Sequence, residues 1–208
     1  MTGIRRTLCL MLAFALTLSL GACSLPMKVI GSIPDPQKTV NAFFDNVCAG
    51  KFKEADQYLS GVSISMKKKV DDSFSQTLYD YLLDSYEYST VGKMTVDNLD
   101  AECKVEFTYL SLNLLSGDLR DKAAGLGNKY MVDATEGYVE KTGDALTITD
   151  EGAKKIAEEA LNSVMETPEK YYASEFFTIR LQYSGSRWLI HLSDELFNAI
   201  CGGFTVEE

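Results

Sequence analysis

The residues of this chain that are best suited to chemistry are its five cysteines and its single histidine, His191. A lone histidine excludes a multi-histidine zinc centre, and no two cysteines have the C-x-x-C spacing of a metal or thiol–disulfide site. The acidic pairs Asp71-Asp72 and Glu158-Glu159 lack the alternating D-x-D-x-D-G loop that binds calcium. No G-x-S-x-G, P-loop or Rossmann glycine motif is present. The motifs therefore predict no metal and no cofactor, and they single out no catalytic residue.

The first 22 residues have the organisation of a secretory signal. Arg5 and Arg6 supply positive charge, and Leu8 to Leu20 form a nearly unbroken apolar run. This run is shorter than the ~20 residues that a membrane-spanning helix needs. We therefore predict a segment that directs export and is then removed.

The end of this segment, Leu20-Gly21-Ala22-Cys23, resembles the lipobox of bacterial lipoproteins. The resemblance implies that the sulfur of Cys23 receives a diacylglyceryl group and that the Ala22–Cys23 peptide bond is then cut. Two acyl chains give stable anchoring, whereas one binds only marginally. The expected location is the cell membrane, with the protein held by lipid on its extracytoplasmic face. The alternative is a plain signal peptide in which the cysteine is incidental.

The charge of the chain argues against a nucleic-acid partner. Cleavage after Ala22 removes two arginines and no acid, so the formal charge changes from −10 to −12. Nucleic acid and anionic lipid head groups repel such a surface, so membrane attachment must come from the lipid on Cys23. Cys48, Cys103 and Cys201 would then remain. They can form at most one disulfide, and buried free thiols are the alternative.

The remaining chain predicts a tether at 23–33 and one domain at 34–208. Asp35 can cap a helix whose first turn accepts Pro36. An apolar stripe at helical spacing follows, and Gly50 ends it. The stripe consists of Val40, Phe43, Phe44 and Val47. A short helix over 52–59 comes next, and Ser65 can cap a third helix that begins at Met66 and runs to Leu82.

Alternating side chains predict two pairs of strands, which makes the fold α+β. The first pair covers 86–96 and 101–112, joined by a polar turn at 97–100. The second covers 177–183 and 187–193, joined by the tight turn Ser184-Gly185-Ser186. Between the pairs, 114–167 is expected to be helical, with Asp150 capping its last helix and Pro168 ending it. Residues 194–204 are expected to form a helical turn.

This order of elements resembles the nuclear transport factor 2-like superfamily. The residues that carry the resemblance are Val40-Asn41-Ala42-Phe43-Phe44, the stretch from Ala55 to Leu59, and Arg187-Trp188-Leu189-Ile190. The resemblance implies N-terminal helices packed on a curved, mainly antiparallel sheet that forms a cone. The helical insertion at about 114–167 departs from that family. It would either cover the mouth of the cone or lengthen one of its walls.

Enzymes of this superfamily place an acid or base inside the cone, and position makes Asp45, Glu106 and His191 the candidates. A carboxylate in an apolar cone would have a raised pKa, which suits proton transfer. However, all three alternate away from the apolar faces of their elements, which predicts surface or rim positions.

The sequence therefore favours a non-catalytic binding or accessory module at the cell envelope, with an apolar or peptide ligand. A pocket enzyme of the isomerase or cyclase kind is one alternative, and a homodimer formed through the sheet is another.

Overall fold

The structure is a computed structural model that describes residues 33–65 and 72–202. The chain divides into two compact units, residues 1–33 and 34–208. The predicted signal peptide, Cys23 and most of the tether lie outside the described residues, as do Met66 to Asp71. Every helix and strand described belongs to the second unit.

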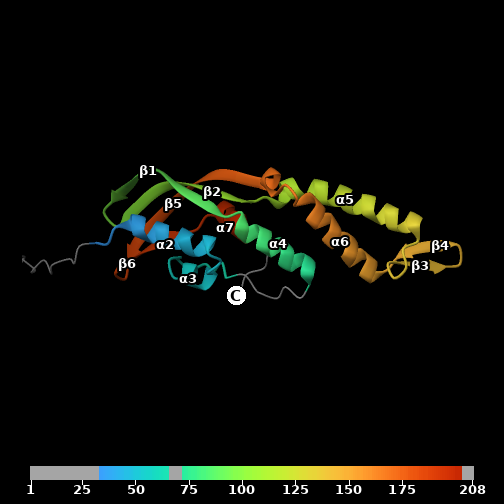
Figure 1. Ribbon diagram of the computed structural model, residues 1–208. Coiled ribbons are helices and arrows are strands. Elements are labelled where there is room, and N and C mark those ends of the chain that lie inside the picture. Colours follow the sequence, from blue (N-terminus) through green and yellow to red (C-terminus); the bar gives the residue numbers. More distant parts are fainter. Residues whose placement is uncertain (1–32, 66–71, 203–208) are drawn as a thin grey trace, which may run out of the picture. The chain divides into compact units, whose positions relative to one another are not determined.

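The second unit is α+β, as the sequence predicted (Figure 1). Its four-stranded sheet is antiparallel, in the order β1-β2-β5-β6, and β3 and β4 form a separate two-stranded sheet. The elements in chain order are α2 (Pro36–Cys48), α3 (Phe52–Asp56), α4 (Ser73–Asp84), β1 (Glu87–Asp97), β2 (Asp100–Leu110), α5 (Leu112–Asp133), β3 (Val139–Thr142), β4 (Ala145–Ile148), α6 (Asp150–Val164), the 3-10 helix η1 (Pro168–Tyr171), β5 (Tyr172–Ser184), β6 (Arg187–His191) and α7 (Asp194–Cys201).

Both predicted hairpins form, and each has positive φ in its turn. Asn98 has φ 55° between β1 and β2. Between β5 and β6, Gly185 and Ser186 have φ 58° and 80°, and Ser184 pairs with Arg187 across them. Positive φ at both central residues matches the right-handed twist of the strands. β5 begins at Tyr172, earlier than the strand predicted from Phe177.

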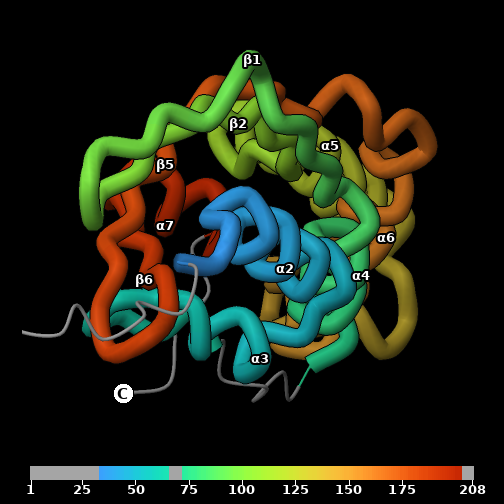
Figure 2. Tube along the Cα trace, turned by 90° about the vertical axis from the view of Figure 1, so that its left-hand side faces the viewer, coloured from blue at the N-terminus to red at the C-terminus, as the bar shows by residue number. Residues whose placement is uncertain are grey.

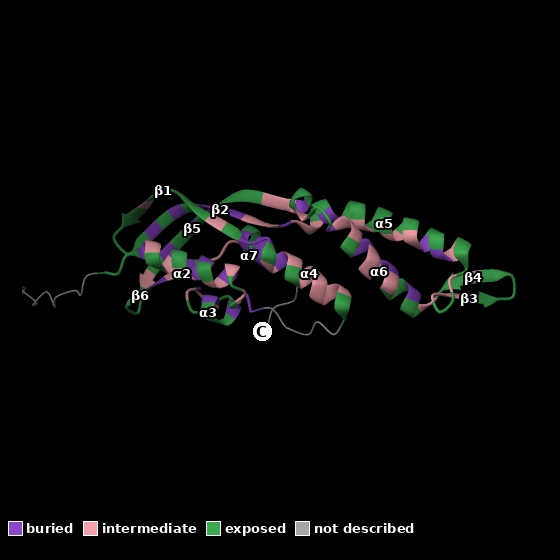
Figure 3. Ribbon diagram, viewed as in Figure 1, coloured by how far each residue is buried: buried purple, intermediate pink, exposed green. Residues whose placement is uncertain are grey.

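The main core lies between the sheet and the helices on one of its faces (Figures 2 and 3). All four residues of the predicted stripe on α2 are fully buried. The ring of Phe44 packs against the rings of Phe43, Tyr88 and Phe107, with centroids 5.0, 5.0 and 5.6 Å away. Trp188 of β6 donates from Nε1 to the carbonyl of Pro34, 2.6 Å away. The alternation in the sequence therefore marks the core face correctly.

The third helix as described, α4, begins at Ser73 and is capped by Asp72, not by Ser65; Met66 to Asp71, where the predicted helix was to begin, lie outside the described residues. The Asp72 carboxylate accepts from the Ser75 N–H at 2.8 Å. The Ser65 hydroxyl instead donates to Asp56 Oδ2 at 2.6 Å. Asp56 also accepts from the Ser63 hydroxyl and the Ile64 N–H, both at 2.7 Å. Ser65 is therefore used to fold the loop after α3 around one carboxylate.

The insertion is not helical throughout, because the hairpin β3–β4 separates α5 from α6 (Figure 1). Gly137 and Gly143 have φ 84° and 65°, which allows the chain to turn before and within the hairpin. Thr149 rather than Asp150 caps α6, because its hydroxyl accepts from the Gly152 N–H at 3.0 Å.

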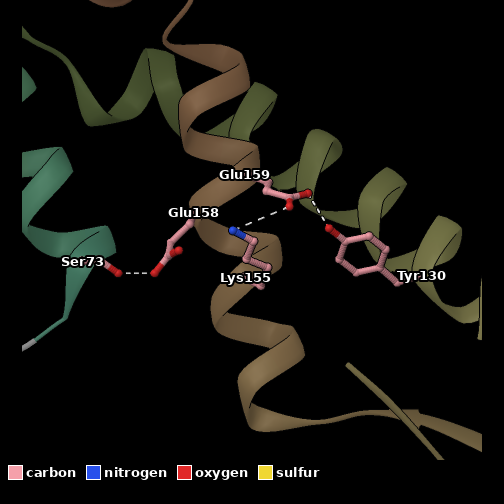
Figure 4. Close-up of polar contacts among 5 residues, drawn as sticks. All are labelled: Ser73, Tyr130, Lys155, Glu158 and Glu159. Carbon is pink, nitrogen blue, oxygen red and sulfur yellow. Dashed lines mark hydrogen bonds and ion pairs between the residues drawn. The ribbon is translucent and has the colours of Figure 1, made fainter. Parts of the chain in front are cut away.

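Side chains on α6 connect it to both neighbouring helices (Figure 4). The Tyr130 hydroxyl of α5 donates to Glu159, which also lies 3.9 Å from Lys155 Nζ. The Ser73 hydroxyl of α4 donates to Glu158. These contacts place α6 between α5 and α4.

Replacing Ser85 by alanine should destabilise the domain. The buried Ser85 Oγ donates to the Leu82 carbonyl at 2.6 Å and accepts from the Leu110 N–H at 2.7 Å, so it joins the end of α4 to the end of β2. Without it, a buried N–H loses its partner, which costs about 1–3 kcal/mol. Urea denaturation of Ser85→Ala measures this, with exposed Ser89→Ala as the control. Equal midpoints for the two variants would contradict the expectation.

Candidate functional site

Asp45 lies on the exposed side of α2 and does not enter the core. Its Oδ1 accepts from the Tyr88 hydroxyl at 2.7 Å. The Tyr88 ring stacks on Phe44, so the pair fastens α2 to β1. Partial burial and the Asp45 carboxylate raise the pKa of the Tyr88 hydroxyl above its ordinary value, which keeps it a donor. The geometry of Asp45 is that of a structural acceptor.

Glu106 and His191 both lie on the sheet face that is turned away from the main core. Glu106 pairs in register with Phe176, and its Oε1 accepts from the Ser174 hydroxyl at 3.2 Å. His191 is exposed at the end of β6 and pairs with Arg180. Phe176 and Arg180 stand four positions apart on β5, and Asp45 belongs to α2. The structure therefore does not bring the three candidates together around one point.

This outer face carries a row of polar and charged side chains across three strands. Glu102, Arg180 and His191 are neighbours in register, and Arg180 Nε lies 3.2 Å from Glu102 Oε2. Next to this row, Lys104 Nζ lies 4.5 Å from the centroid of the Phe176 ring. The Phe176 side chain is 56% exposed. Such an exposed aromatic flanked by charges can contact both apolar and charged groups.

Phe176 was not singled out from the sequence, although a signal for it exists. In a strand with one buried face, the adjacent phenylalanines Phe176 and Phe177 must point to opposite sides. Phe177 faces the core, so Phe176 has to face outward.

A surface hollow of about 490 Å³ lies where β6 ends. A second hollow of about 290 Å³ shares Arg180 and His191 with it. The larger volume is in the range of small-ligand sites. The residues that line the larger hollow are Glu175, Phe176, Phe177, Thr178, Arg180, His191, Leu192, Ser193 and Glu195. This is our candidate site, and of the three predicted residues only His191 belongs to it.

The three cysteines of the domain are free thiols, and no disulfide joins them. Burial raises the pKa of the Cys48 thiol to about 11 and that of Cys201 to about 12. Burial likewise raises the pKa of Cys103. These thiols are protonated at neutral pH and pack as small apolar side chains.

Within residues 33–65 and 72–202, His, Cys, Asp and Glu side chains do not gather in a group that could hold a metal ion. No helix in this part of the chain has both the length and the apolar character needed to cross a membrane. Comparison of the chain with models of protein families, with curated proteins and with solved structures finds no match.

Proposed function

We propose that this protein is an exported lipoprotein, anchored by lipid on Cys23 at the extracytoplasmic face of the cell membrane, and that its domain is a non-catalytic binding or accessory module. The observation that carries the anchor is the sequence Leu20-Gly21-Ala22-Cys23, which follows a charged and then apolar segment. Cys23 stands eleven positions before the unit that begins at Pro34, a length suited to a tether.

Two observations support a binding role over catalysis. The interior between α2 and the sheet is filled by apolar side chains, including Phe44 and Phe107. The hollow at the end of β6 is open to the surface and offers charged and aromatic groups to a ligand. Proton transfer inside the cone would need an ionisable group in the interior beside a polar partner, and Asp45, Glu106 and His191 lie on the outside of the core.

We also propose that the domain has the nuclear transport factor 2-like cone. Support comes from α2, whose apolar stripe packs beneath the sheet, and from the hydrogen bonds that join the segment after α3 to β6. Ile190 donates to the Tyr58 carbonyl at 2.7 Å, and Ser60 donates to the Ile190 carbonyl at 3.0 Å. An experimental structure in which the sheet does not close around α2 would refute the cone.

Substituting Cys23 by alanine should release the protein from the membrane, because diacylation requires its sulfur. The measurement is membrane fractionation of cells together with intact mass of the mature chain. Wild type should sediment with membranes and carry the acyl mass on Cys23. Cys23→Ala should stay in the soluble fraction and carry no acyl mass. Cys48→Ala is the matched control and should remain acylated. Retention of Cys23→Ala with its acyl mass would refute the anchor.

A further inference from the structure

One edge of β5 is paired with β6 over only five of the thirteen residues of β5. β5 spans Tyr172–Ser184, whereas β6 pairs only with Arg180 to Ser184. Nearer its start, β5 runs on toward α5 and α6 beyond the end of β6 (Figure 1). No other strand of the described chain pairs with this stretch on the β6 side.

The backbone groups of this stretch point toward the vacant side. The Tyr183 N–H donates to the Leu99 carbonyl at 2.7 Å, which shows that odd-numbered residues of β5 direct their backbone groups toward β2. Alternate residues of an antiparallel strand bond to opposite neighbours. The even-numbered Ser174, Phe176 and Thr178 therefore direct N–H and C=O groups away from β2, along the line that β6 would occupy if it were longer.

The hollow of about 490 Å³ lies along this edge, since Phe176, Thr178 and His191 all line it. After His191 the chain leaves the sheet and enters α7, whose first turn includes Glu195. The space beside β5 is thus bounded by the end of β6 on one side and by α7 on another.

The free edge of β1 is less suited to pairing. Its register with β2 shifts between Val91 and Thr95, where Gly92 has φ 78° and Lys93 follows. Bulges and lysines are devices that protect sheet edges from further strands. β5, in contrast, keeps an uninterrupted register with β2 from Tyr172 to Gln182.

We propose that an extended peptide of a partner protein binds here by adding a strand beside Ser174–Thr178, in line with β6. This proposal deepens the binding role proposed above and rests on it. The peptide's main chain would pair with the free groups of Ser174, Phe176 and Thr178, and its side chains would alternate between the Phe176 ring and the opposite face. Five residues of β5 span about 17 Å.

We call the space beside Ser174–Thr178, in line with β6, the peptide slot. The charged and polar side chains at its two ends define which peptide it suits. Arg180 and His191 lie at one end. The Nε of Arg180 donates to Glu102, and the other N–H groups of its guanidinium suit a peptide carboxylate. Glu175 and Glu195 both line the other part of the hollow and suit a lysine or arginine. We therefore expect an apolar or β-branched segment with an acidic residue at one end and a basic residue at the other.

The test uses the mature protein, in nanodiscs where it carries the acyl mass and in solution where it does not. The ligands are two blocked hexapeptides, acetyl-Lys-Thr-Val-Thr-Val-Glu-amide and acetyl-Glu-Val-Thr-Val-Thr-Lys-amide, one for each strand direction. Calorimetric titration measures affinity, and amide hydrogen exchange by NMR reports on Ser174, Phe176 and Thr178. One peptide should bind saturably and slow exchange at these three amides. Charge reversal by Arg180→Glu should weaken its binding about tenfold or more.

N-methylated peptides test strand addition without altering the protein. An added strand uses the N–H groups of alternate residues only. Methylation of one alternate set should therefore weaken binding tenfold or more, whereas methylation of the other set should change it less than about threefold. Equal losses for both sets would show side-chain binding and overturn the proposal.

Two other results would also overturn it. One is that neither peptide binds saturably. The other is that, without peptide, the exchange protection depends on protein concentration, which would indicate a second copy of the protein in the slot.

These failures are distinguishable from failure of the anchor. If the protein carries its acyl mass and neither peptide binds, only the peptide slot is rejected. If the chain lacks acyl modification yet binds one peptide with the methylation pattern described, only the anchor is rejected.

Discussion

The variant Phe44→Ala is expected to lose about 3–5 kcal/mol of unfolding free energy, the range for removing a large buried aromatic side chain. Phe44 is fully buried and contacts three other rings, from α2, β1 and β2. Its removal leaves a cavity between the helix and the sheet, where the neighbours are held by their own packing. Since domains are stable by only about 5–15 kcal/mol, this loss is a large fraction of the total unfolding free energy.

Thermal or urea denaturation of the mature protein measures this effect. The loss corresponds to a melting temperature lower by roughly 6–20 °C for a domain of this size. Phe176→Ala is the matched control, because it makes the same chemical change at a side chain that is 56% exposed. It should cost about 1 kcal/mol or less, chiefly the contact with Lys104. Similar losses at both positions would contradict the packing described.

The second large effect is expected for Gly152→Ala, near the start of α6. A Cβ built at Gly152 would overlap the carbonyl oxygen of Tyr138, and both atoms are fixed to the backbone, so neither can turn away. The same carbonyl accepts from the Thr149 N–H at 3.0 Å, so it helps to hold the chain on both sides of the β3–β4 hairpin. Relieving the clash must shift α6 or the hairpin. We expect a cost of about 3 kcal/mol, at the upper end for overpacking.

Hydrogen exchange by mass spectrometry locates this effect. Peptides from residues 139–164 should exchange faster in Gly152→Ala, while peptides from β2 should keep their wild-type rates. Gly125→Ala is the matched control, because a Cβ at this position within α5 meets open space. It should stabilise α5 by about 0.5–1 kcal/mol through helix propensity. Faster exchange in both variants would show that the close approach at Gly152 is not the cause.

Much of the fold could be predicted because it depends on neighbours in the sequence. The stripe on α2, the alternation in β2 and the turn at Gly185-Ser186 each follow from a local period or a local φ requirement. The cap Asp35 was predicted for the same reason, and its carboxylate accepts from the Gln37 N–H at 3.0 Å. These features need no knowledge of what lies across the core.

The predictions that failed and the features that were missed concern residues whose partners are distant in the sequence, or elements too short to show a pattern. Ser65 has the chemistry of a helix cap, but its hydroxyl donates to the Asp56 carboxylate nine positions earlier, and α4 begins only at Ser73. The strands β3 and β4 are four residues each, too short for alternation to separate them from helix. His191 could be named from its type, whereas Arg180 and Phe176 became part of the site only when β5 was placed between β2 and β6.

By itself, the sequence determined the α+β class and which side of α2 and β2 faces the core, because side-chain period and local capping decide these. The export and lipid-attachment signal is a prediction from the sequence alone. The tertiary structure alone decided that β6 is shorter than β5 and leaves more than half of one edge of β5 without a neighbouring strand. The physical reason is that the length of strand pairing depends on where the chain turns away into α7 and packs on the core, and residues distant in the sequence set that point.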